Sequence, residues 1–501
     1  MFVKNKIYAL IAAGTIMLAC SCGNNKIGER VHLSWWVYPF SHVSKTSSNF
    51  AENEMYRELM RRLNVDIEFI HPSGRVDLNL LKSSANLPDL IEGDMTAFLG
   101  GPQRAIDEGF IISLDPYLEK YSPNYSRILQ ENRDWDKEVT TSDGTHYTYA
   151  WIRGDESLLY WTGPIVRSDL LDLAGLSVPQ TIEEWEEALM TFKQMNIEYP
   201  LSFSGVACNS FLGAFNVGKD FYQIDGIVKF APMEDGYRDY ITVMKRWYDY
   251  GLLDTEFFVQ NAAVVEDKVK NAKVGAFVGA LGSNMGNCIP YLKQIGAELA
   301  GAPFPTMHKG DEAIFGEKDY FYFADTSVSI SGNCKNIEAA ARLLDYGYSD
   351  EGHMLYNFGI EGVSYNMVDG YPKYTELITN NPDGLSMQFA MSMYMASAYG
   401  GPFIQDKREY EQYIPYPEQK QAIKEWSRSQ GKQIIPRGAI AYDNENLSAR
   451  IISYCEQQSV RFITGERPIE QYGQFKDELI TMGINDIIEA KQEALELYNN
   501  K

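Results

Sequence analysis

Cysteine and histidine are scarce in this sequence, and neither stands in a pattern that binds metal. The 501-residue chain has six of each. No two cysteines form the CxxC pair of a structural zinc site, and the histidines are scattered without ligand spacing. We therefore expect no metal site and no cofactor.

Positive charge is also in short supply. Lys and Arg number 45 against 68 Asp and Glu, which gives a formal net charge of -23. Nucleic-acid binding needs a basic surface, so this balance excludes that class of partner. It also disfavours a polyanionic ligand, although a few arginines in a binding site would override this locally.

Motifs of common enzyme classes are missing. The sequence has no HExxH, GxSxG or GxGxxG. Residues 213–220, "GAFNVGKD", have the glycine spacing of a phosphate-binding loop and Lys219, but Asp220 replaces the Ser or Thr that holds magnesium. We expect no catalysis. Carboxylate pairs for glycoside hydrolysis cannot be singled out from so many, so a secreted enzyme acting on polysaccharide stays open as an alternative.

The one long apolar run lies at the N-terminus and predicts export. Lys4 and Lys6 precede an apolar stretch too short to span a membrane, which ends in "MLACSCG". This ending resembles a bacterial lipobox. We expect residues 1–19 to be a lipoprotein signal peptide, with Cys20 lipidated (palmitate) and Cys22 as the alternative. Residues 20–29 would then link the lipid anchor, on the extracytoplasmic face of the cell membrane, to the folded chain.

The other four cysteines lie far apart along the chain. In an oxidising compartment they can form disulfides in three connectivities, and otherwise they are small buried apolar residues. The sequence leaves both states open for Cys208, Cys288, Cys334 and Cys455.

Helix and strand patterns alternate, which favours an α/β fold. Thr181 and Glu184 have the spacing of a capping box before an amphipathic helix. A final amphipathic helix is predicted over residues 484–498. No repeat or long linker is present, so we expect two interleaved lobes.

Adjacent tryptophans mark the first predicted strand, "LSWWVYPF". Neighbouring side chains of a strand point to opposite faces, so Trp35 and Trp36 cannot share one. Leu33 is on the face of Trp35 and is the better core residue. We therefore expect Trp36 to be the outward, ligand-facing one, with both rings buried in a core as the alternative.

Several segments, in the same order along the chain, resemble the family 1 extracellular solute-binding proteins, the lipoproteins that supply carbohydrate ABC importers. They are "LPDLIEGD", "GFIISLDPYLEKYSPNYSRIL", "DGTHYTYAW", "PIVRSDLLDLAGLSVPQTIEEWEEALMTFK", "ITVMKRWYDYGLLD", "EAAARLLDYGYSDEGHMLYNFGIEGVSY" and "FITGERPIEQYGQFKDELITMGIND". Together they cover nearly the whole chain after the N-terminal signal.

The resemblance implies a two-lobed, periplasmic-binding-protein-like α/β fold that closes on its ligand by hinge motion. The expected first lobe is 30–147 and 323–380, and the second is 148–322 and 381–501. The implied function is non-catalytic capture of an oligosaccharide by a monomer, with membrane permease subunits and a cytoplasmic ATPase as partners. A surface glycan-binding lipoprotein without a transporter is the other alternative. Neither the sugar nor the number of host membranes can be inferred.

Ligand residues are expected where strands end and where the chain crosses between lobes. Aromatic rings would cover the apolar faces of sugars, and polar side chains would bind their hydroxyl groups. For Arg167 a structural salt bridge is the alternative. The candidates are Trp35, Trp36, Tyr38, Glu92, Asp94, Tyr149, Trp151, Trp161, Arg167, Asn284, Tyr399 and Arg437.

Many proteins of this family carry an EF-hand-like calcium loop after the segment that corresponds to "MTFK". Here "FKQMNIEYPLSF" continues directly, with Asn196 and Glu198 as the only suitable oxygen side chains. We expect no calcium at this position.

Overall fold

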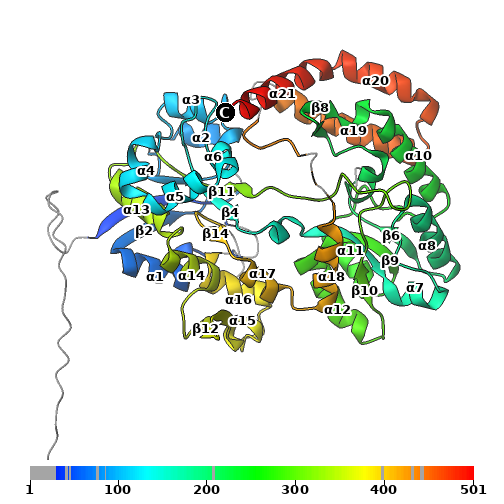
Figure 1. Cartoon of the computed structure of the whole chain (residues 1–501), viewed down its shortest axis with the longest axis horizontal. Helices are drawn as coiled ribbons and strands as arrows, with labels where there is room; N and C mark the ends of the chain where they lie inside the picture. The colour runs from blue at the N-terminus through cyan, green and yellow to red at the C-terminus, as the bar shows by residue number, and fades with distance from the viewer. Residues whose placement is uncertain are drawn as a thin grey trace, which may run out of the picture.

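Two lobes, each built on its own β-sheet, make up the computed structural model (Figure 1). The structure describes residues 30–39, 43, 47–74, 78–84, 86–205, 209–396, 400–429, 431, 434–439 and 445–501. The expected lipidation at Cys20, with its alternative Cys22, lies outside the described residues, and so do Cys208 and Tyr399.

The first lobe has a six-stranded mixed sheet in the order β14-β4-β11-β3-β1-β2. Its strands are β1 (Val31–Trp36), β2 (Val65–Ile70), β3 (Leu90–Glu92), β4 (Tyr149–Arg153), β11 (Tyr322–Ile330) and β14 (Ile404–Gln405). Around it lie α1 (Glu54–Leu63), α2 (Leu78–Lys82), α3 (Gly101–Asp107), α4 (Asp115–Tyr121), α5 (Pro123–Glu131), α6 (Arg133–Glu138), α13 (Ile337–Tyr346), α14 (Asp350–Phe358), the hairpin β12 (Tyr365–Val368) and β13 (Tyr371–Tyr374), α15 (Glu376–Thr379), α16 (Met387–Tyr394) and α17 (Lys407–Tyr413).

The second lobe has a four-stranded sheet in the order β10-β5-β9-β6. Its strands are β5 (Thr162–Arg167), β6 (Tyr199–Ser202), β9 (Val274–Ala280) and β10 (Leu299–Gly301). Its other elements are α7 (Ser168–Ala174), α8 (Ile182–Gln194), α9 (Asn209–Leu212), the hairpin β7 (Phe221–Ile224) and β8 (Ile227–Phe230), α10 (Asp235–Asp249), α11 (Ala262–Lys270), α12 (Gly286–Lys293), α18 (Pro417–Trp426), α19 (Glu445–Thr464), α20 (Tyr472–Thr481) and α21 (Ile484–Asn499).

Local sequence signals set the ends of several helices. The predicted capping box is confirmed at α8, where the Thr181 hydroxyl accepts from the Glu184 amide and the Glu184 carboxylate accepts from the Thr181 amide. The final helix is also confirmed, as α21. Within the described part of the chain, no helix is long and apolar enough to cross a membrane.

In the part of the chain that the structure describes, three segments pass between the lobes, and they correct the expected boundaries. β4 and β14 hydrogen-bond into the first sheet, although the boundaries at 147 and 380 assign both to the second lobe. The passages therefore fall between β4 and β5, just before β11, and between β14 and α18. Sheet membership depends on long-range pairing, which the sequence segments alone do not reveal.

A further contact between the lobes comes from the C-terminus, where α21 extends toward the first lobe (Figure 1). The Tyr498 hydroxyl donates to Oε1 of Glu138 in the first lobe at 3.0 Å, and the Lys501 ammonium donates to the Thr140 carbonyl at 2.9 Å. The amide of Gly438, which lies between α18 and α19, donates to Oε2 of Glu138 at 2.9 Å. We call this set of bonds the C-terminal contact.

Both tryptophans of β1 are buried, on opposite faces of the sheet. Trp35 is 0% exposed and lies in the core with Tyr56 and Phe69. Trp36 is 7% exposed and belongs to a second apolar cluster with Leu78 of α2. The predicted alternation is confirmed, but the expectation of an outward Trp36 is wrong because helices cover this sheet on both faces.

The described cysteines Cys288, Cys334 and Cys455 are free and buried. Burial raises the pKa of the Cys288 and Cys334 thiols to about 12. This agrees with the reading of these three residues as small apolar side chains rather than as disulfide partners.

Candidate functional site between the lobes

The first and second passages between the lobes bring three side chains together. Arg153 ends β4, Trp161 precedes β5, and Asp319 precedes β11. Oδ2 of Asp319 accepts a hydrogen bond from the Arg153 guanidinium at 2.6 Å and another from the Trp161 indole at 2.9 Å. The indole is thus held at its nitrogen while 42% of the residue remains exposed.

Asp319 is ionised in this arrangement. Burial alone would raise its pKa, but the positive charge of Arg153 and the hydrogen bonds from Tyr320, Arg153 and Trp161 hold the pKa of Asp319 below its usual range. The ion pair is mostly buried, with side-chain exposures of 9% for Arg153 and 19% for Asp319. A buried carboxylate with these donors fixes the orientation of the exposed indole.

A second group lies beside the first, and it joins the two lobes. The Arg437 guanidinium stands over the Tyr320 ring at 4.6 Å, and its NH1 atom is 3.8 Å from Oδ2 of Asp94. Asp94 follows β3 of the first lobe, whereas Arg437 lies between α18 and α19. Together with Arg153, Trp161 and Asp319, these residues form what we call the interlobe cluster.

Asp94 has one oxygen that is held locally and one that is not. Its Oδ1 caps a short 3-10 helix, accepting from the Thr96 amide at 2.9 Å and from the Thr96 hydroxyl at 2.5 Å. Burial raises the pKa of Asp94, while the Thr96 bonds and Arg437 oppose this rise. Oδ2 has the longer ion pair with Arg437 and is the better placed of the two oxygens to accept a further hydrogen bond.

Exposed aromatic side chains follow the strands that lead to this region. Tyr38, after β1, is 38% exposed, and its contact with a ligand stays a prediction. Phe258 is 43% exposed on a loop held to the end of β6, where the Asp254 amide donates to the Leu201 carbonyl. The β5 register places that sheet end beside Trp161, since Thr162 pairs with Ala280 at the end of β9. Phe258 had no sequence motif of its own, only its place in the pair "FF" within a loop.

Other candidate residues have structural partners. Glu92 is buried, and burial raises its pKa well above the usual range. The Tyr149 hydroxyl bonds to Ser122 inside the first lobe at 2.6 Å. The Trp151 ring lies between Phe323 and Phe403. All three residues are buried, although Trp151 precedes Arg153 of the interlobe cluster by only two residues.

Arg167 and Asn284 also serve the second lobe internally. Two atoms of the Arg167 guanidinium donate to the two carboxylate oxygens of Asp169, each at 2.7 Å, and the pair is mostly buried. Arg167 therefore forms the structural salt bridge that was the alternative to ligand binding. The Asn284 carbonyl accepts from the Ala280 amide at 3.0 Å, which fixes the turn after β9. The structure therefore does not bring either residue into the interlobe cluster.

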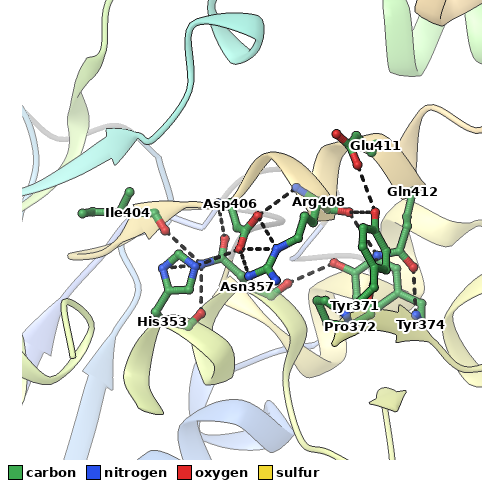
Figure 2. A network of polar contacts seen from close by, with 10 residues as sticks. All are labelled: His353, Asn357, Tyr371, Pro372, Tyr374, Ile404, Asp406, Arg408, Glu411 and Gln412. Atoms are coloured by element: carbon green, nitrogen blue, oxygen red, sulfur yellow. Dashed lines mark hydrogen bonds and ion pairs between the residues drawn. The ribbon is translucent and has the colours of Figure 1, made fainter. Parts of the chain in front are cut away.

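The third passage between the lobes is fixed to the first lobe by the polar network in Figure 2. Asp406, just after β14, accepts from the Arg408 amide at 2.8 Å and from His353 Nε2 of α14 at 2.9 Å. Oδ1 of Asn357 accepts from the Asp406 amide, and its Nδ2 donates to the Ile404 carbonyl. Burial alone would raise the pKa of Asp406, but His353 and Arg408 hold it well below its usual range.

The segment after α8 offers no clear calcium ligand set. Glu198 pairs with Lys273 at 3.0 Å, and Asn196 has a positive φ of 63° in the turn. Among the residues that the structure describes, no group of three or more His, Cys, Asp or Glu side chains could hold a metal ion. The absence of calcium at this position stays a prediction.

The two lobes, the three passages and the polar cluster between them define the solute-binding protein fold. A model of the bacterial extracellular solute-binding protein family matches residues 63–354, more than half of the chain. The chain belongs to this family.

Curated relatives include proteins that bind glycans of different charge. The fructooligosaccharide ABC transporter substrate-binding protein FusA of Streptococcus pneumoniae is 27% identical over 314 residues, which are 57% of this chain and 55% of FusA. The polygalacturonan/rhamnogalacturonan-binding protein YtcQ of Bacillus subtilis is 24% identical over 388 residues, 72% of this chain and 73% of YtcQ. The chain thus matches only about half the length of FusA.

Solved structures share the fold over nearly the whole chain. The alginate-binding protein AlgQ2 has a TM-score of 0.74 at 19% identity, covering 94% of this chain and 98% of that one. An HMO-binding, ABC-transporter-associated solute-binding protein from Bifidobacterium longum infantis has a TM-score of 0.76 at 18% identity, covering 94% of this chain and 99% of that one. FusA in complex with kestose has a TM-score of 0.73 at 20% identity, covering 94% and 100%.

Proposed function

We propose that this protein captures an oligosaccharide between its two lobes and delivers it to an ABC importer in the membrane. It acts without catalysis, as a monomer held by a lipidated Cys20 on the extracytoplasmic face. The observation that carries the proposal is the exposed Trp161 indole, held by the buried Arg153–Asp319 pair where the chain crosses between the lobes. Family membership and the glycan-binding relatives support it.

The chemistry of the interlobe cluster suits a sugar. A flat indole covers the apolar C–H face of a pyranose or furanose ring, and neighbouring carboxylates accept hydrogen bonds from hydroxyl groups. Trp161 comes from the second lobe and Asp94 from the first. A ligand that touches both would favour the conformation in which the lobes lie closest, which is how a bound solute shifts a hinged protein toward closure.

The test is a thermal-shift screen of the purified protein against a library of oligosaccharides, followed by calorimetry on each hit. A ligand that binds only the folded state raises the melting temperature by mass action. At a hundredfold excess over Kd, it increases the free energy of unfolding by about 2.7 kcal/mol. At least one oligosaccharide should do so, and small-angle scattering should show compaction with it. Release of shorter sugars from any glycan would instead establish the enzyme alternative. Binding without neighbouring permease genes would favour the transporter-independent alternative.

A further inference from the structure

The cations near the passages between the lobes already have carboxylate partners. Arg153 pairs with Asp319, and Arg437 faces Asp94. The lysines and the third arginine of this region are also paired: Lys318 with Glu156 at 2.8 Å, Lys407 with Asp155 at 3.0 Å and Arg408 with Asp406. These five pairs are drawn from the described part of the chain.

Breaking the Arg153–Asp319 ion pair so that Arg153 could bind a ligand would cost considerable free energy. Arg153 is mostly buried, so turning its guanidinium toward a bound carboxylate would leave Asp319 buried without its counter-charge. Oδ2 of Asp319 also accepts from the Trp161 indole, so moving Arg153 would remove the guanidinium that holds this acceptor in place. An acidic sugar that bound Arg153 would therefore disturb the Trp161 indole on which a sugar ring is expected to lie.

Arg437 is held more loosely, but its surroundings are acidic. Asp94 is 3.8 Å away, and Glu138 lies close enough to act on the same guanidinium electrostatically. The Tyr320 ring covers one face of the guanidinium at 4.6 Å. One uronate contacting Arg437 would meet these carboxylates, and a uronate polymer would also meet the repulsion of a chain with net charge -23.

We infer that the ligand is a neutral oligosaccharide rather than a uronate polymer, and that Oδ2 of Asp94 accepts a hydrogen bond from one of its hydroxyl groups. This inference rests on the proposed function and narrows it. The relatives make the choice a real one, since FusA is named for a neutral glycan and YtcQ for an acidic one. Asp94 supplies an acceptor from the first lobe, and Trp161 supplies a ring from the second.

The experiment is isothermal titration of the mature protein with two panels of matched chain length. One panel holds neutral fructo-, gluco-, manno- and galacto-oligosaccharides, and the other holds oligogalacturonides and alginate oligomers. Titrations at about 0.05 M and about 0.5 M NaCl bracket the range in which exposed charges are progressively screened. We expect a neutral ligand whose affinity is nearly independent of salt, and uronates that bind at least about 100-fold more weakly.

A uronate that binds as tightly as any neutral oligosaccharide, and weakens as salt rises, would overturn the inference while leaving the proposed function intact. Binding to neither panel would count against both. The two failures are therefore distinguishable in one data set.

Asp94→Asn tests the hydroxyl acceptor. Asparagine keeps an oxygen for the cap but loses the charge, so affinity for the neutral ligand should fall about 10-fold, the size of a lost charge-assisted hydrogen bond. Asp115→Asn is the control, because it removes one carboxylate from the first lobe at the start of α4, outside the interlobe cluster. Equal affinity for Asp94→Asn and Asp115→Asn would overturn the role of Asp94.

Discussion

The third passage and the C-terminal contact both connect the lobes, but they are held in different ways. Asp406 in the third passage is bound by His353 and Arg408, and its backbone is bound by Asn357, so this part of the passage belongs to the first lobe (Figure 2). The C-terminal contact instead joins first-lobe Glu138 to Tyr498 and Gly438, which come from second-lobe segments.

The difference determines what a hinge rotation must change. A rotation of the lobes leaves the Asp406 network intact, because all its members move with the first lobe. The same rotation must break or rearrange the C-terminal contact, because its two sides belong to different lobes. We therefore expect changes at Asp406 to alter stability and changes at the C-terminal contact to alter the balance of conformations.

The largest expected effect is on stability, from Asp406→Ala. This change leaves the Arg408 guanidinium and His353 without their buried partner, and losing one member of a buried ion pair costs about 3–5 kcal/mol. The unfolding free energy from urea titration at pH 7 should fall by about that amount. Lys407→Ala, which removes the neighbouring half-exposed pair with Asp155, should cost less than ~1 kcal/mol.

The same residue predicts sensitivity to acid. The pKa of Asp406 is lower in the folded protein than in the unfolded chain, so its contribution to stability is present above pH ~4 and is lost as pH falls further. The difference in unfolding free energy between wild type and Asp406→Ala should therefore shrink below pH ~4. A constant difference down to pH ~2 would contradict this assignment.

The next effect concerns affinity, from Trp161→Ala. If the exposed indole carries a sugar ring, its loss should cost more than ~2 kcal/mol of binding free energy, or roughly 30-fold in Kd. Stability without ligand should change little, because much of the ring is already exposed. Tyr250→Ala is the control: Tyr250 is 48% exposed and lies at the C-terminal end of α10, where its carbonyl binds Lys193. Calorimetry with a screened ligand should separate the two variants.

Features set by neighbouring residues could be predicted from the sequence, whereas features set by long-range strand pairing could not. The α8 cap and the alternation at Trp35 and Trp36 depend on neighbouring residues, so both followed from sequence. The burial of Trp36 did not, because it depends on β1 lying between two parallel partners, β2 and β3, in a sheet covered on both faces.

The candidate site shows the same division. The sequence predicts Trp161, Asp94 and Arg437 each from its own position, at a passage, a strand end or a loop. No local pattern could show that Arg437 would stand over Tyr320 and face Asp94, because those contacts depend on how the lobes lie. Asp319 was missed for the same reason: it has no motif, and only the tertiary fold places it against Arg153 and Trp161.

A smaller effect on stability is expected from Glu409→Gln, which sharpens the description of the third passage. Glu409 lies three residues after Asp406. Among the residues that the structure describes, Gln405 Nε2 is the one side-chain donor to its carboxylate, at 3.1 Å, and burial raises the pKa of Glu409 to about 8. Because this pKa is above the unfolded value, the contribution of Glu409 to stability is greatest below pH ~4 and is lost as pH rises toward 8.

Glutamine keeps the size of the side chain and never ionises. The Glu409→Gln variant should therefore match wild type most closely at pH ~4, and its advantage in unfolding free energy should grow as pH rises, to at least ~1 kcal/mol at pH 8, since each unit of pKa shift is worth about 1.36 kcal/mol. Melting curves across this pH range provide the measurement. If the two proteins show parallel pH profiles, Glu409 does not titrate in this window.

The smallest expected effect on stability, and the most direct test of the comparison between the two connections, comes from Tyr498→Phe. The change removes the hydroxyl that donates to Glu138 and keeps the ring beside Gly438 and Lys137. Loss of one such bond costs about 1 kcal/mol, which is too little to unfold either lobe but changes a conformational ratio about fivefold. Because the bond joins different lobes, its loss should release the lobes rather than loosen one of them.

The measurement is the distribution of distances between spin labels placed one on each lobe, recorded without ligand. We expect Tyr498→Phe to broaden this distribution or move it away from the distance in the structure, with a melting temperature close to that of wild type. Tyr371→Phe is the matched control, because its hydroxyl bonds within the network of the third passage, to the Arg408 carbonyl and to Glu411. If both variants leave the distances unchanged, the C-terminal contact does not restrain the lobes. If Tyr371→Phe shifts them as much as Tyr498→Phe does, the distinction between a network that moves with one lobe and a contact between two lobes fails.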